Sequence, residues 1–215
     1  GTLVCLTPGE SISMKENNKE FPSKGWILAF HPDLICGTPL GLNIHNYTFF
    51  SYCPEEALHL SLREKQIILE FLERIRQELE RCIDRHSKKI ISKYIELLLD
   101  YCTRFYERQF ITRSEVNKKV FREFNNHFNV KVSLSTDVLS DEYCANLLHL
   151  SPAYFNDLLK YEIGKEFKEY IQFKRFEIAK GWLVNTDKKL GQIAQELGFS
   201  NSQYFSRLFK KITGC

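Results

Sequence analysis

The C-terminal part of the sequence contains one helical pattern twice, and this repeat constrains the fold more than any other feature. In the first copy, a short helix with an apolar face is expected over 141–148. Ser151-Pro152 follows, and these are favoured residues for the cap and the first position of a helix, so a second helix should run to about 161. A helix, a tight turn and a capped helix make a helix-turn-helix unit.

The second copy follows about fifty residues later. A helix over 190–197 should end at Gly198, which suits the left-handed backbone of a helix C-terminus, and another helix is expected over 201–213. The copies align at an offset of fifty residues, which pairs Phe155 with Phe205 and Gly164 with Gly214. The repeat therefore predicts two helix-turn-helix units.

Residues 166–183, between the two copies, carry apolar side chains at the spacing of one straight amphipathic helix. Eighteen helical residues are about 27 Å long. With a bundle packed at each end, such a helix could hold two recognition helices about 34 Å apart, which is one turn of B-DNA. Both could then enter consecutive major grooves on one face of a duplex.

The motifs of this region are similar to those of the AraC family of bacterial transcription regulators, and the resemblance covers residues 136–215. It rests on Ser151-Pro152-Ala153-Tyr154-Phe155, Ile193-Ala194, Leu197-Gly198-Phe199 and Tyr204-Phe205-Ser206-Arg207-Leu208-Phe209-Lys210-Lys211. The sequence departs from the family by stopping at Gly214-Cys215, where members usually continue with a short tail. The resemblance implies an all-α double helix-turn-helix domain that binds DNA.

By the resemblance, the exposed face of the second helix in each unit reads bases. These positions are Ser151, Ala153, Asn156 and Asp157 in the first unit, and Ser202, Gln203, Ser206 and Arg207 in the second. Arg207 can pair with guanine, Gln203 and Asn156 with adenine, and Lys210 and Lys211 with phosphates. Asp157 repels phosphate unless it accepts from cytosine, so the first unit is expected to bind more weakly.

Two longer amphipathic helices are expected over 61–86 and 88–109. Ser61-Leu62-Arg63-Glu64 fits the capping box that starts a helix. The apolar stripes of these helices suit either an internal core or a subunit interface, and both at once. We therefore expect connecting and dimerisation helices in 59–112, with a short helix and a linker over 113–134.

Residues 1–58 contain short apolar runs between glycines and prolines, which is typical of short strands and turns. The runs 25–30 and 47–50 are the clearest of these expected strands. The motifs Gly25-Trp26, Phe30-His31-Pro32 and Gly37-Thr38-Pro39-Leu40-Gly41 resemble the end of the cupin-like sensor half of the same family. We expect the C-terminal part of a β sensor domain here, with its first strands missing.

Composition excludes few functions but gives no support to catalysis. The net charge of +3 neither demands nor rules out a polyanionic partner. The seven cysteines form no C-x-x-C pair, the six histidines are dispersed, and no phosphate loop, nucleophile elbow or paired-carboxylate motif occurs. We therefore predict no enzyme activity, no cofactor and no metal site. Without an apolar run of about 18 residues or a signal peptide, we expect a reduced, cytoplasmic protein.

The predicted fold class is α+β, mainly α: a partial cupin-like β segment, two connecting helices, and a double helix-turn-helix domain over 135–215. The predicted partners are double-stranded DNA, a small-molecule effector, a second copy of the chain through 61–109, and RNA polymerase. Two alternatives stay open. One is a cupin-type metal-binding protein or enzyme with an accessory helical domain, and the other is an interaction protein that does not bind DNA.

Overall fold

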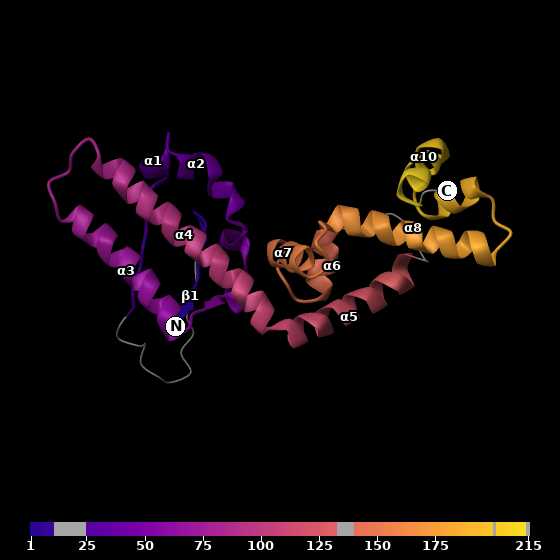
Figure 1. The fold of residues 1–215 in the computed structure, drawn as a ribbon, viewed down its shortest axis with the longest axis horizontal. Helices are drawn as coiled ribbons and strands as arrows, with labels where there is room; N and C mark the ends of the chain where they lie inside the picture. The colour runs from indigo at the N-terminus through magenta and orange to yellow at the C-terminus, as the bar shows by residue number, and fades with distance from the viewer. Residues whose placement is uncertain (11–24, 133–139, 200, 214–215) are drawn as a thin grey trace. The chain divides into compact units, whose positions relative to one another are not determined.

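The computed structural model describes residues 1–10, 25–132, 140–199 and 201–213, and the described chain is mainly helical, as predicted (Figure 1). It divides into two compact units, residues 1–112 and 113–215. Each unit buries its own cluster of apolar side chains.

The N-terminal segment of the first unit is mostly helical turns, not strands. Its elements are β1 (Thr2–Leu3), α1 (Pro32–Ile35), α2 (Pro39–Asn43), three 3-10 turns, η1 (Ile44–Asn46), η2 (Thr48–Ser51) and η3 (Pro54–Glu56), and then β2 (Leu58–His59). The two short strands pair antiparallel, with Thr2 opposite His59 and Leu3 opposite Leu58. The predicted strand at 47–50 is wrong, because residues 48–50 belong to η2, and residues 25–30 form no regular element.

The prolines explain this difference. Pro32, Pro39 and Pro54 each occupy the first position of a short helix, where a missing N–H costs nothing. The residue before each proline acts as the cap; the Thr38 hydroxyl, for example, accepts from the backbone N–H of Gly41 at 3.2 Å. The prolines thus start helices where turns between strands are expected from the sequence, and the described residues give no support to a cupin-like sheet.

Two long helices, α3 (Leu62–Leu79) and α4 (Ser87–Thr112), carry most of the core of this unit. The predicted capping box is confirmed, since Ser61 and Glu64 exchange side-chain and backbone hydrogen bonds. The first helix ends at Leu79, seven residues earlier than predicted. Asp84 accounts for this, because its carboxylate accepts from the backbone N–H groups of His86 and Ser87 and so starts α4.

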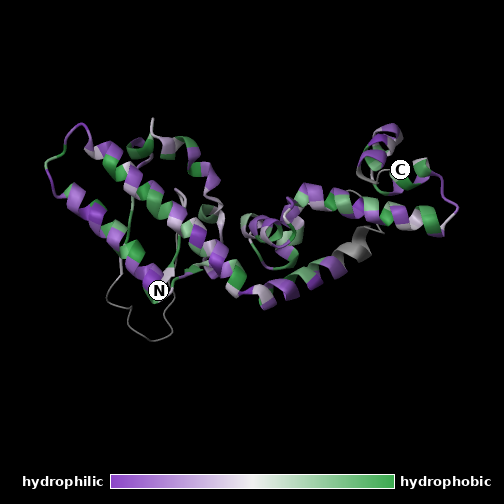
Figure 2. Cartoon of the chain, in the orientation of Figure 1, coloured by the Kyte–Doolittle hydropathy of each residue, from purple (hydrophilic) through white to green (hydrophobic). Residues whose placement is uncertain are grey.

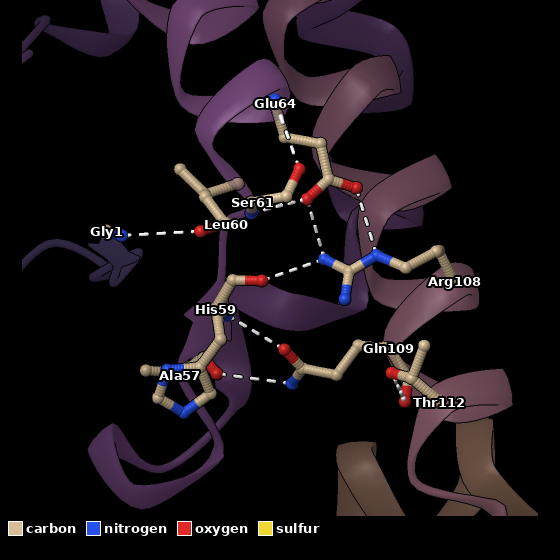
Figure 3. A network of polar contacts seen from close by, with 9 residues as sticks. All are labelled: Gly1, Ala57, His59, Leu60, Ser61, Glu64, Arg108, Gln109 and Thr112. Atoms are coloured by element: carbon tan, nitrogen blue, oxygen red, sulfur yellow. Dashed lines mark hydrogen bonds and ion pairs between the residues drawn. The ribbon is translucent and has the colours of Figure 1, made fainter.

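A polar network ties the strand β2 to both long helices (Figure 3). The Arg108 guanidinium donates to both carboxylate oxygens of Glu64, at 2.9 and 2.8 Å, and to the carbonyl of His59 at 2.7 Å. The neighbouring Gln109 amide is buried; it accepts from the N–H of His59 and donates to the carbonyl of Ala57. One turn of α4 thus holds the chain that leads into α3.

The second unit contains α5 (Ser114–Val132), α6 (Asp141–Leu147), α7 (Pro152–Ile163), α8 (Phe167–Asn185), α9 (Leu190–Glu196) and α10 (Ser202–Thr213). In the segment predicted as a short helix and a linker, 113–134, the helix is longer than expected, because α5 takes up 19 residues. Phe124 of this helix is 1% exposed and its ring packs against Phe155 and Tyr170. The Tyr170 hydroxyl also donates to the Asn125 side chain at 2.5 Å, so α5 is part of the core.

The central helix α8 buries different faces at its two ends. Near its start, Phe167 packs on Phe155 of α7. Nine residues later, Phe176 packs on Phe199, Phe205 and Phe209. Nine residues are two and a half turns, so these faces are opposite. Hydrophobic and hydrophilic residues accordingly alternate along α8 in Figure 2, where one continuous apolar stripe was expected.

Candidate nucleic-acid interface

The first helix-turn-helix unit consists of α6 and α7, joined by a tight turn. His149 adopts a left-handed conformation in this turn, with φ of 55°. The N–H of Leu150 then donates back to the carbonyl of Ala145 at 2.9 Å. Ser151 caps α7 by accepting from the N–H of Tyr154, and Gly164 ends the helix with φ of 70°. The predicted helix, turn and capped helix are confirmed.

The second helix-turn-helix unit, α9 and α10, repeats this geometry. Gly198 has φ of 78°, and the N–H of Phe199 donates to the carbonyl of Ala194 at 2.9 Å. The Asn201 side chain caps α10 by accepting from the N–H groups of Gln203 and Tyr204, at 2.8 and 3.0 Å. Asn201 stands fifty residues after Ser151, so the caps obey the offset seen in the sequence. The partner that this offset assigns to Gly164, Gly214, lies outside the described residues.

Equivalent residues of the two units are also buried alike. Ala145 and Ala194 are both fully buried; they stand 49 residues apart because the turn of the α9–α10 unit is one residue longer. Phe155 and Phe205, fifty residues apart, are at most 1% exposed. Because these side chains fix where the first helix meets the second, each unit holds its second helix in the same way. The function of these residues is to set the direction of α7 and α10.

The outer face of α10 is basic and polar. With 100° of rotation per residue, Gln203, Arg207 and Lys210 lie about 140–160° around the helix from the buried Phe205. All three are exposed, as are Ser202 and Lys211. Ser206, at the edge of this face, donates its hydroxyl to the carbonyl of Ser202. Gln203, Arg207, Lys210 and Lys211 thus share one surface, whereas Ser202 lies about 60° from Phe205 on the side of the helix.

The predicted residues of the first helix-turn-helix unit are less exposed than those of the second. Ser151 is only 5% exposed and its hydroxyl is used in the cap, so its assignment to the base-reading face is corrected. Ala153, Asn156 and Asp157 are half-buried. The Asn156 amide donates to the carboxylate of Asp141 at 3.0 Å, which holds it against α6.

Sequence reasoning missed three features of this region. The helix expected over 201–213 includes Asn201, although asparagine is a strong helix cap and lies just before the helix. Tyr204, at 57% exposure, extends the surface of α10 beside the basic face. Arg175 of α8 places its guanidinium 5.8 Å from the centre of the Phe199 ring, and this contact could not be seen before the helices were placed.

Other chemistry finds little support in the described part of the chain. There, no group of three or more histidine, cysteine, aspartate or glutamate residues is close enough to hold a metal ion. Six cysteines in this part are free thiols, and burial raises the pKa of Cys5 to about 12. None of the described helices has the length and apolarity needed to cross a membrane.

The fold and the exposed face of α10 define a helix-turn-helix domain with two units. A family model described as a helix-turn-helix domain matches residues 144–215. Geometry and comparison together assign DNA-binding transcription regulation to this domain.

Several curated proteins are similar to the chain. An uncharacterised helix-turn-helix transcriptional regulator of Bacillus subtilis, YtdP, is 43% identical over 70 residues, 33% of this chain and 9% of its own length. AdaA of Bacillus subtilis, a bifunctional transcriptional activator and DNA repair enzyme, is 40% identical over 79 residues, 37% of each chain. The regulator YijO of Escherichia coli is 24% identical over 213 residues, 99% of this chain and 73% of YijO.

The chain spans only part of the length of YtdP and AdaA. The matched segments span 9% and 37% of the lengths of YtdP and AdaA. The likeness to YijO covers both units at lower identity. No solved structure matches the chain.

Proposed function

We propose that the chain is an AraC-type transcription regulator whose helices α7 and α10 enter successive major grooves of one duplex. The observation that carries this proposal is the repeated geometry of the two units. Each has a left-handed turn residue, His149 or Gly198, and a side-chain cap, Ser151 or Asn201, at equivalent positions. A single helix, α8, joins them and packs against both.

The length of α8 supports the proposed spacing. Its 19 residues make a helix about 28 Å long. One turn of B-DNA is about 34 Å, and the helices packed at each end of α8 add to its length. Arg207, the one arginine on the outer face of α10, has the shape and charge to pair with a guanine edge in the second groove.

Selection from a pool of random duplexes tests the proposal directly. We expect the wild-type chain to enrich two elements about one helical turn apart. Arg207→Ala should relax the preference at a guanine position in one element and cost about 1–3 kcal/mol of binding free energy. Arg74→Ala, which removes an exposed arginine from α3 in the other unit, is the charge-matched control and should bind like the wild type.

The result could also contradict the proposal. Enrichment of one element, or binding without sequence preference, would exclude reading by two units. Unchanged selectivity of Arg207→Ala would remove this side chain from base reading. Equal losses of affinity in Arg207→Ala and Arg74→Ala would mean that Arg207 contributes only through the overall charge of the protein.

We further propose that residues 1–112 are the regulatory half, responding to a small-molecule effector and pairing with a second copy through α3 and α4. Support comes from its separate core and from exposed apolar side chains on these helices, such as Leu79 and Leu97. RNA polymerase is the proposed target of the DNA-bound protein. Sedimentation of the wild type and of Leu97→Glu tests the pairing, because a buried carboxylate should dissociate the dimer. A monomeric wild type would contradict it.

A further inference from the structure

The two recognition helices can be compared position by position, because the same offset of fifty residues places their buried and exposed residues in register. The buried Phe155 and Phe205 anchor the comparison. The positions turned away from the core then pair as Ala153 with Gln203, Asp157 with Arg207, Lys160 with Lys210, and Tyr161 with Lys211.

This comparison shows a charge reversal at the centre of the outer face. Where α10 has Arg207, α7 has Asp157. Both lie about 160° around their helices from the buried phenylalanine, although Arg207 is exposed and Asp157 is half-buried. Over the four paired positions, α10 carries three positive charges, whereas α7 carries one of each sign.

The same difference extends over the whole units. Residues 140–164 contain four acidic side chains and one basic one, a formal charge of −3 with histidine neutral. Residues 188–213 contain five basic side chains and one acidic one, a formal charge of +4. The modest net charge of the chain therefore conceals a strongly polarised domain.

The one basic side chain of residues 140–164, Lys160, is also partly neutralised. The ammonium group of Lys160 lies 3.5 Å from the carboxylate of Glu166. Its counterpart Lys210 forms no ion pair with any other residue that the structure describes, and neither do Arg207 and Lys211. Attraction to DNA depends on how many phosphates a protein neutralises. The second unit can neutralise several, and the first almost none.

We propose that the second helix-turn-helix unit, α9 and α10, provides nearly all of the electrostatic attraction and the guanine reading. The first helix-turn-helix unit, α6 and α7, then binds its groove only weakly. This inference rests on the proposed function, since it assigns unequal shares of the same DNA contact. It predicts an asymmetric site in which one groove is contacted strongly. In the other groove, Asp157 favours a cytosine, whose amino group is the donor that a carboxylate can accept from.

A salt titration of duplex binding with matched variants tests the inference. The selected duplex and the full chain are used, with Lys210→Ala and Lys160→Ala as the paired variants. Lys210→Ala should make the slope of log affinity against log salt shallower by about 0.9, so that a fourfold rise in salt costs the variant about threefold less affinity than it costs the wild type. Lys160→Ala should leave the slope unchanged.

The charge reversal offers a second, gain-of-function arm. Asp157→Arg should raise affinity at low salt and steepen the slope by about 0.9, because a new phosphate or guanine contact forms in the first groove. The isosteric Asp157→Asn separates loss of repulsion from gain of attraction, and should raise affinity without steepening the slope as much.

The outcomes separate this inference from the proposed function. Equal slope changes in Lys160→Ala and Lys210→Ala, or weaker binding by Asp157→Arg with intact folding, would overturn the asymmetry while leaving two-unit DNA binding in place. A wild-type chain with no salt-dependent affinity for any duplex would overturn the proposed function itself, and the inference with it. Helical circular dichroism of each variant shows whether it is folded.

Discussion

His149 and Gly198 adopt the same left-handed backbone conformation at equivalent turns, with φ of 55° and 78°. Only one of them is a glycine, so the same turn costs more conformational free energy in the first helix-turn-helix unit than in the second. A residue with a Cβ loses about 1–2 kcal/mol in this region, although histidine tolerates it better than most.

From this we predict opposite effects of two substitutions. Gly198→Ala should destabilise the second unit by about 1–2 kcal/mol, and His149→Gly should be stabilising by about 0.5 kcal/mol, after the greater entropy of unfolded glycine is subtracted. Urea unfolding in a Trp26→Phe background isolates the fluorescence of Trp182, which lies in this unit. Wild-type stability of Gly198→Ala would refute the assigned turn.

Gly41 should be intolerant of any side chain for a different reason. A Cβ at this position would lie 2.2 Å from the backbone oxygen of Ile35, which cannot move without shifting α1. We predict that Gly41→Ala lowers the melting temperature of the first unit, with a cost of about 1–3 kcal/mol.

Gly181 provides the matched control for Gly41, because it lies inside α8 and an added Cβ would meet nothing within 4 Å. Gly181→Ala should stabilise the second unit by about 0.5–1 kcal/mol through its helix propensity. Calorimetry of both variants should move two different transitions in opposite directions. Similar losses in both would argue against the close approach of α1 and α2.

Phe124 tests whether α5 belongs to the core of the second unit. Its ring is buried against Phe155 and Tyr170, so Phe124→Ala should cost about 3–5 kcal/mol. Val116 of the same helix is 61% exposed, and Val116→Ala should be nearly neutral. The fluorescence of Trp182 again follows unfolding. A neutral Phe124→Ala would return this segment to the role of a linker.

Glu64 should make the first unit sensitive to acid. Partial burial raises the pKa of Glu64, but hydrogen bonds from Ser61 and from the Arg108 guanidinium outweigh this and hold the pKa below its usual value. A carboxylate with a depressed folded pKa contributes stability above its unfolded pKa of about 4.3, and this stability is lost as pH falls through the folded value.

We therefore predict that Glu64→Gln is less stable than the wild type at pH 7 by about 1 kcal/mol and that the difference shrinks below about pH 4. Urea unfolding of the first unit at several pH values measures both. Glu73 pairs with Arg76 on the exposed surface, and Glu73→Gln is the control that should change little. A constant deficit of Glu64→Gln at every pH would exclude the ionic contribution.

Local signals in the sequence predicted several helix ends well. The Ser61 capping box, the Ser151-Pro152 helix start and Gly198 each depend on a few adjacent residues, and each is found where expected. Such signals reflect backbone hydrogen bonds that are satisfied within one turn, so they need no knowledge of the tertiary fold.

The failures have a common physical origin in packing between distant residues. Whether Phe124 sits in a linker or a core depends on its contact with Tyr170, 46 residues later. Prolines 32, 39 and 54 fit both a turn between strands and the first position of a helix, and only the placement of the chain on α4 decides between them. Ser151 was assigned to an exposed surface because a cap and a base reader can be the same residue type.

Because α8 buries opposite faces at its two ends, the number of its residues fixes how the two helix-turn-helix units are rotated relative to each other. Inserting one residue between Tyr170 and Phe176 would turn the second unit by about 100° relative to the first, and no side-chain change could compensate for that rotation. Point mutations on α7 and α10 can alter which bases are preferred, but the count of residues in α8 decides whether both preferences can be met on the same duplex. Any descendant of this protein that keeps two-unit recognition should therefore vary in its turns and keep this helix free of insertions and deletions.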